Sequence, residues 1–363
     1  MDRRDFLRAA GIATAGVAWP RRGWPGSAEA PSSGDWRTFD VVTRVEVLQP
    51  SGLTRVWVPT ALAVQTPYQK TLDNSFRAEG GTARLVGEGN PDGVGMVAAE
   101  FPAGVRPVLL VTSRASTRNY AVDLAAPSAT PKLSRAEREH FLRSTTLLPT
   151  GGIVRERAVE ITRNAHTDAD KARAIYEWIV ENTFREAKVR GCGTGDIRAM
   201  LDTKNLGGKC ADLNSLYVGL ARAAGLPARD VYGIRTAKSE LGYKSLGASS
   251  ATITKSQHCR AEVHLASHGW VPVDPADVRK VVLEEQPGNR ELHDAMVESA
   301  RTRLFGSWEV NWMAYNFAHD VALPGSKQGP VAFLMYPQAE TDQGRLDSLD
   351  PDHFKYEITS TEA

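Results

Sequence analysis

The residue in this sequence best placed for nucleophilic chemistry is Cys210. It follows two glycines at 207 and 208 and opens an apolar stretch that ends at Gly225 and Pro227. This pattern predicts a helix beginning at the cysteine, where unpaired backbone NH groups and the positive end of the helix dipole favour a thiolate. Free cysteines are more often buried structural residues than nucleophiles, so a catalytic role requires suitable partners.

Two such partners occur downstream, at the ends of a predicted hairpin. Residues 257–265 and 270–274 have the composition of two strands, with a turn at Gly269. His258 opens the first strand and Asp274 closes the second, so antiparallel pairing brings both side chains to the same end of the sheet. The sequence therefore contains a candidate triad of nucleophile, base and orienting carboxylate, Cys210, His258 and Asp274.

The elements that must position this triad can be identified by their periodicity. Apolar residues recur every three or four positions along 210–224, and 230–234 has the character of a buried strand. Thr167 and Asp170 form an acidic variant of the capping box before a second amphipathic helix, which we expect to pack on the nucleophile helix. The glycine-rich residues 190–196 lack the Lys-Ser/Thr of a phosphate-binding loop and are expected to form a flexible wall of the cleft.

Together these residues resemble the transglutaminase-like superfamily of papain-like cysteine enzymes. The similarity rests on a glycine-then-cysteine helix start with Asp212 two places on, an Ala-Gly-Leu-Pro-Ala-Arg helix exit, a His-x-x-x-Glu-Val strand and a Gly-Trp-Val-Pro-Val-Asp-Pro strand. These pieces cover 167–278, and the resemblance implies a core with a helix-borne cysteine, an antiparallel sheet and the same triad.

The sequence departs from that family at two positions. Ala211 stands where animal transglutaminases have a tryptophan directly after the cysteine, which argues against protein crosslinking of the animal kind. Arg260 stands where many bacterial relatives have a tryptophan two places after the histidine. This second departure leaves the shape of the acceptor side open.

Composition excludes several other classes of protein. The 363 residues carry a formal charge of +1 and show no basic stripe interleaved with aromatics, so nucleic acid is not an expected partner. Residues 1–30 combine Arg3-Arg4, a mild apolar run and a small-x-small site at Ala28 to Ala30, which predicts a twin-arginine signal peptide and a periplasmic or secreted protein. Beyond this stretch no run is long enough for a membrane span.

The chain as a whole is expected to be α+β. Period-two alternation over 36–125 predicts an N-terminal antiparallel β-sandwich, with a packing role favoured over carbohydrate or peptide binding. A linker at 125–131 leads to a catalytic domain at 133–363, which includes a C-terminal extension.

Several other residues receive provisional assignments. The aromatic cluster at 305–317 is expected in the core, with a substrate-lining wall as the alternative. Acidic side chains at 277, 284 and 285 are expected in solvent, as are His264 and His268 on the hairpin. Cys192 and Cys259 are the remaining cysteines, and a disulfide between them competes with two separate buried thiols.

The predicted function is acyl transfer on amide bonds by an exported thiol enzyme. The backbone NH of Cys210 is the expected oxyanion donor. Water is favoured over an amine as acceptor because nothing in the sequence builds an amine pocket; transamidation and a non-catalytic binding scaffold are the alternatives. No cofactor or metal is expected, since the scattered cysteines lack zinc-site spacing. The expected partner is a peptide, protein or peptidoglycan-fragment substrate, and the oligomeric state stays open.

Overall fold

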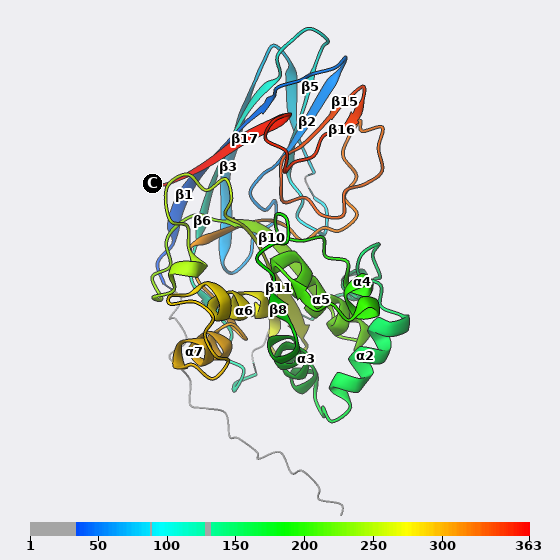
Figure 1. Ribbon diagram of the computed structural model, residues 1–363, viewed down its shortest axis with the longest axis vertical. Coiled ribbons are helices and arrows are strands. Elements are labelled where there is room, and N and C mark those ends of the chain that lie inside the picture. Colours follow the sequence, from blue (N-terminus) through cyan, green and yellow to red (C-terminus); the bar gives the residue numbers. More distant parts are fainter. Residues whose placement is uncertain (1–33, 88, 128–131) are drawn as a thin grey trace, which may run out of the picture.

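The structure is a computed structural model that describes residues 34–87, 89–127 and 132–363. The predicted signal peptide at 1–30 and most of the predicted linker lie outside these residues. Figure 1 shows an elongated molecule with a strand-rich part at one end and a mixed helix and strand part at the other. The predicted α+β class, with a strand-rich N-terminal region and a helix-bearing core, is confirmed.

The strand-rich part contains two antiparallel sheets. One has the order β17-β1-β6-β3, made by Phe354–Glu362, Arg37–Val47, Val108–Thr117 and Gln69–Glu79. The other has the order β16-β15-β2-β5-β4, made by Gly344–Arg345, Gln338–Thr341, Thr54–Pro59, Met96–Phe101 and Thr82–Val86. Alternate side chains of both sheets meet in a shared core that includes Val45, Val56, Phe101, Leu109 and Phe354.

The C-terminal strands pair with the N-terminal sandwich, although the sequence analysis assigns them to the catalytic domain. β15, β16 and β17 fall within the predicted catalytic domain, yet β17 pairs along β1 from Phe39↔Glu362 to Val47↔Phe354, and β15 pairs with β2. The N-terminal sandwich is therefore completed by the end of the chain. Periodicity predicts a strand but not its distant partner, so the boundary at 133 marks only where the chain enters the core.

The core combines seven helices with a four-stranded sheet in the described residues. The helices are α1 Arg135–Leu142, α2 Gly152–Thr162, α3 Asp168–Asn182, α4 Ile197–Thr203, α5 Cys210–Ala223, α6 Pro275–Glu284 and α7 Ala295–Arg303, with a 3-10 turn at Lys244–Leu246. The antiparallel sheet has the order β12-β11-β10-β14, made by Gly269–Val273, Gln257–Leu265, Ala228–Arg235 and Trp312–Asn316. Short pairs join β7 Tyr120–Ala121 to β13 Ser307–Trp308, and β8 Phe184–Arg185 to β9 Gly207–Gly208. None of these helices is long and apolar enough to span a membrane.

α5 is the central element of this core. Every one of its residues is buried, because α2, α3 and α6 pack around it while β10 and β11 lie against it. The predicted helix and its packing on α3 are both present, and Thr167 and Asp170 form the predicted capping box of α3. A helix buried on all sides holds its first residue on a rigid support.

The structure decides between the two alternatives for the aromatic cluster and corrects the expected exposure of two histidines. The aromatic cluster Phe305, Trp308, Trp312, Tyr315 and Phe317 is buried core, and none of its members lines the cavity described below. The expectation that His264 and His268 are exposed is wrong, because they are only 7% and 8% exposed. The His264 ring packs edge-on against Trp270, at 5.3 Å between ring centres, and His268 lies 2.8 Å from the Ser267 hydroxyl.

Candidate active site

Cys210 is the first residue of α5, and the short strand β9, made of two glycines, precedes it, separated by one residue. Gly207 and Gly208 form β9, and a Cβ added at Gly208 would lie 2.4 Å from the Cβ of Asp212. Asp212 explains this crowding, because its carboxylate folds back over the helix start. It accepts from the backbone NH groups of Lys209 at 2.9 Å, Thr194 at 2.9 Å and Gly195 at 3.0 Å. One carboxylate therefore fixes both the nucleophile turn and the glycine-rich loop beside it.

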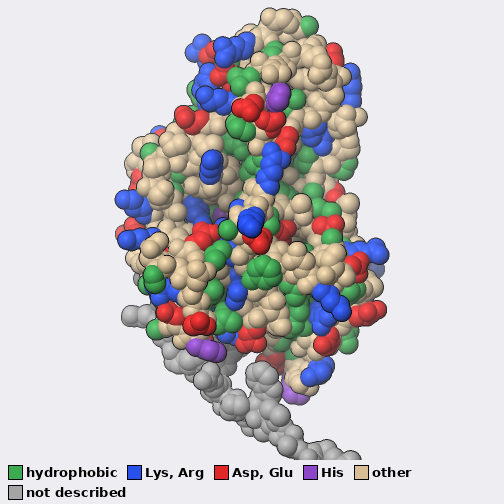
Figure 2. Space-filling view, in the orientation of Figure 1, with side chains coloured by type: hydrophobic (Ala, Val, Ile, Leu, Met, Phe, Trp, Pro, Cys, Tyr) green, Lys and Arg blue, Asp and Glu red, His purple; other side chains and the backbone are tan. Residues whose placement is uncertain are grey.

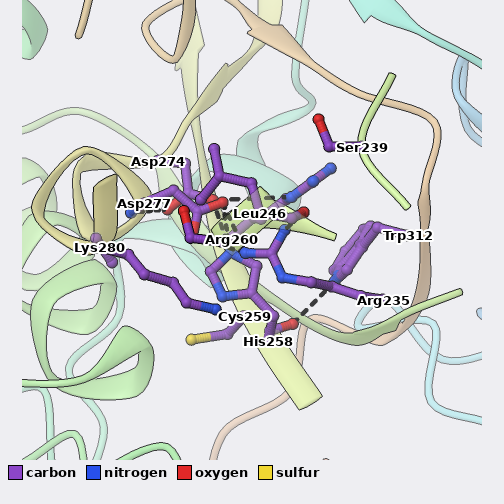
Figure 3. Close-up of polar contacts among 12 residues, drawn as sticks. Arg235, Ser239, Leu246, His258, Cys259, Arg260, Asp274, Asp277, Lys280 and Trp312 are labelled. Atoms are coloured by element: carbon purple, nitrogen blue, oxygen red, sulfur yellow. Dashed lines mark hydrogen bonds and ion pairs between the residues drawn. The ribbon is translucent and has the colours of Figure 1, made fainter. Parts of the chain in front are cut away.

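His258 and Asp274 meet as the hairpin predicts. The Nε2 atom of His258 lies 2.7 Å from Oδ2 of Asp274, and both side chains are buried (Figure 3). Asp274 caps α6, where its Oδ1 accepts from the backbone NH of Asp277 at 3.1 Å and from Nδ2 of Asn214 at 3.0 Å. Trp312 donates its indole NH to the His258 carbonyl oxygen at 2.9 Å. His258 is thus held both at its imidazole ring, by Asp274, and at its backbone carbonyl, by Trp312.

The thiol of Cys210 faces the imidazole and two other thiols. Hydrogen bonds from Cys192, then Cys259, then His258 hold the pKa of Cys210 well below its ordinary value of 9.0, despite burial. The pKa values of Cys192 and Cys259 are raised, by the hydrogen bond to Cys210 and by burial respectively. Cys210 is therefore the thiolate of the cluster, and the other two are neutral donors.

The Cys192–Cys259 disulfide that the sequence allowed is not formed. All three cysteines are free and buried. Both side thiols interact with Cys210, and Cys192 also donates to the carbonyl oxygen of Gln257 at 3.4 Å. Counting cysteines could pair the two remaining residues, but it could not show that both of them interact with Cys210.

Asp277 is a second carboxylate at the histidine, which the sequence analysis placed in solvent. That expectation is wrong: Asp277 is 1% exposed, and its Oδ2 lies 3.4 Å from Nε2 of His258. Arg235 Nη2 lies 2.6 and 2.8 Å from its two oxygens. Asp-Pro followed by Asp three residues after the cap is typical of a helix start, so the signal for this residue was present in the sequence.

The pKa values of Asp274 and Asp277 are shifted in opposite directions. Burial and the nearby charge of Asp277 raise the pKa of Asp274. Burial acts in the same direction on Asp277, but Arg235, His258 and Lys280 together outweigh it and lower the pKa of Asp277. Burial lowers the pKa of His258, but Asp277 and then Asp274 outweigh burial, so it is raised from 6.5. A lowered thiol pKa beside a raised imidazole pKa favours a thiolate and imidazolium pair.

A cavity of about 500 Å³ opens over Cys210 and His258. Its walls include Cys192 from the glycine-rich loop, residues 254–257 at the start of β11, and Tyr336 and Tyr356 from the C-terminal segment. The glycine-rich loop thus lines the cleft. The sequence did not predict this C-terminal wall, because Tyr356 lies on β17, which pairs with β1, and Tyr336 precedes β15, which pairs with β2.

Residues 155–275 match the sequence pattern of the transglutaminase-like superfamily, and this range contains Cys210, His258 and Asp274. The segment is a transglutaminase-like core. The resemblance seen in the sequence is therefore confirmed at the level of the superfamily.

Two similar proteins extend this comparison. An uncharacterized protein of Haemophilus influenzae is 41% identical over 231 residues, which are 61% of this chain and 62% of that protein. The crystal structure of a candidate cysteine protease from Cytophaga hutchinsonii superposes with a TM-score of 0.57 at 14% identity, covering 91% of this chain and 93% of the other. The second similarity shows a shared fold that extends beyond the transglutaminase-like core.

Arg260, the second departure from the family pattern, lies away from the cavity. Its guanidinium stacks over Trp312, 4.7 Å from the ring centre, and its Nε lies 3.8 Å from Oδ2 of Asp274. Arg260 therefore lies beside Asp274 and does not line the cavity.

One group in the core has the residue types of a metal site. Ligand atoms of His258, Asp274 and Asp277 lie within 4.8 Å of one another. Each of these atoms already has a protein partner, since Asp274 accepts from His258 and Asn214, while Asp277 accepts from Arg235. The guanidinium of Arg235 occupies the place where a cation would neutralise Asp277, so this donor set fits an imidazole oriented by hydrogen bonds better than a metal.

Proposed function

We propose that this protein is a thiol hydrolase that cleaves amide bonds in peptides, proteins or peptidoglycan fragments, with Cys210 as nucleophile. The observation that carries the proposal is that Cys210 and His258 line one cavity, with Asp274 buried behind His258 at 2.7 Å from its Nε2. The superfamily match and the fold shared with a candidate cysteine protease support the same reaction class.

The proposed mechanism begins with attack of the Cys210 thiolate on the substrate carbonyl carbon. The backbone NH of Cys210 stabilises the developing oxyanion, and no acceptor meets this NH among the described residues. His258 gives its proton to the leaving amine, which departs and leaves a thioester on Cys210. Nε2 is held by Asp274, so Nδ1 is the nitrogen that exchanges the proton. Water, deprotonated by the now neutral His258, then cleaves the thioester and releases the carboxylic acid.

The charge of the cavity favours water over an amine as the acceptor. Six lysine or arginine side chains line it and no aspartate or glutamate does. A primary amine acceptor is an ammonium ion at neutral pH, so this lining repels it. The positive lining therefore disfavours transamidation, whereas neutral water, the acceptor in hydrolysis, is not repelled.

The test uses a mixed peptide substrate pool, with and without a fluorescent primary amine. Mass spectrometry is expected to detect amines released by the wild type, with little incorporation of the fluorescent amine. Cys210→Ala is expected neither to release amines nor to incorporate the fluorescent amine. A folded Cys210→Ala variant with full turnover contradicts the nucleophile. Amine incorporation exceeding hydrolysis overturns the hydrolase assignment in favour of a transamidase.

Export through a twin-arginine signal is a second part of the proposal. It rests on the sequence of residues 1–30, since these lie outside the described structure. Fractionation of cells is expected to find the shortened chain in the periplasm or medium. Replacing Arg3 and Arg4 by lysine is expected to retain the full-length chain in the cytoplasm, and unchanged export would refute the assignment.

A further inference from the structure

The cavity over Cys210 carries an excess of positive charge. Its cationic lining residues are Arg185, Arg190, Lys209, Arg235, Lys255 and Lys280. Figure 2 shows lysine and arginine side chains along the middle of the visible face, where the sandwich meets the core. A cluster of one sign on a concave wall focuses the potential into the cavity.

Carboxylates outside the cavity neutralise only part of this charge. Glu284 pairs with Arg185 and lies 3.7 Å from Lys280, Asp347 pairs with Arg190, and Asp277 pairs with Arg235. Six cations therefore face three carboxylates. Within the described chain, Lys209 and Lys255 form no ion pair, and Lys255 is exposed at the mouth before β11.

The buried part of the wall holds one hydroxyl without a hydrogen-bond partner in the described chain and one desolvated ammonium. The Tyr336 hydroxyl is buried beside the Cys192 thiol and forms no hydrogen bond with the described residues. Lys280 extends from α6 toward the His258 ring (Figure 3), and burial lowers the pKa of its ammonium. Both groups would be stabilised by an anion in the cavity, because a desolvated donor gains most from a charged acceptor.

We propose that the cavity recognises its acyl donor through an anionic group, so that the preferred substrates are acidic peptides carrying a carboxylate near the scissile amide. This inference rests on the proposed function, in which Cys210 is the nucleophile. It names the substrate class that the triad leaves open. Lys209 and Lys255, the cations without a carboxylate partner, would contact the substrate anion, and Tyr336 would donate to it.

Two thiol reagents of similar size, iodoacetate and iodoacetamide, test the charge of the cavity without a known substrate. Mass spectrometry locates the alkylated cysteine, and the quantity measured is the ratio of the two rates at Cys210. The His258 imidazolium also favours the anionic reagent, so the decisive comparison is between wild type and lysine variants. Lys255→Met and Lys209→Met are each expected to lower the ratio by about two- to fivefold, and 0.5 M salt to lower it in wild type.

Lys132→Met is the matched control, since Lys132 is exposed before α1 and does not line the cavity. Its ratio is expected to equal that of wild type. A ratio that is the same in all four proteins and insensitive to salt overturns the anionic site while leaving the nucleophile in place. Cys210 that reacts with neither reagent contradicts the proposed function instead.

If Cys210 reacts with neither reagent, a binding measurement tests whether the cavity recognises an anion. Calorimetric titration of Cys210→Ala with the blocked peptide Ala-Glu-Ala is compared with titration by blocked Ala-Gln-Ala. Tighter binding of the glutamate peptide that is lost in the Cys210→Ala, Lys255→Met double variant supports the proposal. Equal binding of the two peptides overturns it.

Discussion

Nε2 of His258 lies 2.7 Å from Oδ2 of Asp274 and 3.4 Å from Oδ2 of Asp277, so one imidazole nitrogen faces two buried carboxylates. The two acids are separated by one turn of α6, and they differ in their other partners. Asp274 accepts hydrogen bonds from His258, Asn214 and the backbone NH of Asp277, with Arg260 at 3.8 Å, whereas Asp277 is paired directly with Arg235. The first is placed to orient the ring, and the second to balance a buried guanidinium.

Asp274→Asn is expected to lower kcat by about 10²–10⁴-fold with little loss of stability. The amide keeps the helix cap of α6 but can present an NH₂ group to Nε2 of His258, which favours the wrong tautomer. Steady-state kinetics on the substrate found in the release assay provide the measurement. An unchanged rate would assign the orienting role to Asp277.

Asp277→Asn is expected to destabilise the protein by about 3–5 kcal/mol, because it leaves Arg235 buried without a full counter-charge. Urea denaturation provides the free energy of unfolding. The control is Glu139→Gln, which removes the exposed ion pair with Arg135 and should change stability by less than about 1 kcal/mol. Equal effects of the two substitutions would show that the buried pair is not needed.

Asp212→Ala is expected to cost about 2–4 kcal/mol, because three backbone NH groups lose a charged acceptor. The glycine-rich loop should then detach from the start of α5 and become sensitive to proteolysis near residues 190–196. Limited proteolysis with mass spectrometry checks the position of the cut. Unchanged resistance of the loop to proteolysis would contradict its attachment through Asp212.

Cys192→Ala is expected to raise the pKa of Cys210, because it removes a thiol that donates to the thiolate. Cys192→Ser restores a donor and should return the pKa toward the wild-type value. The rate of Cys210 alkylation against pH measures both. Identical profiles for the alanine and serine variants would show that the donor at 192 has no role.

The positions of the three candidate triad residues could be predicted because each follows from a local pattern. The glycines before Cys210 indicate a helix start, and the hairpin fixes His258 and Asp274 at one end of a sheet whatever else surrounds it. Asp277 was recoverable from the Asp-Pro helix signal but was assigned to solvent, since local sequence does not show that Arg235 lies opposite. The cavity wall at Tyr356 depends on β17 pairing with β1, and Tyr336 precedes β15, which pairs with β2; no local pattern encodes either of these contacts between distant parts of the chain.

The pH dependence of Cys210 alkylation by iodoacetamide tests the central claim most directly. The account predicts a rate that is already high well below pH 9.0, the ordinary thiol pKa, and that falls only when acid protonates the thiolate. The raised pKa of His258 should keep the imidazolium present above pH 6.5. In His258→Ala the profile should move toward that of an ordinary thiol. A wild-type rate that rises only near pH 9.0, with no change in His258→Ala, would contradict the proposed thiolate and imidazolium pair.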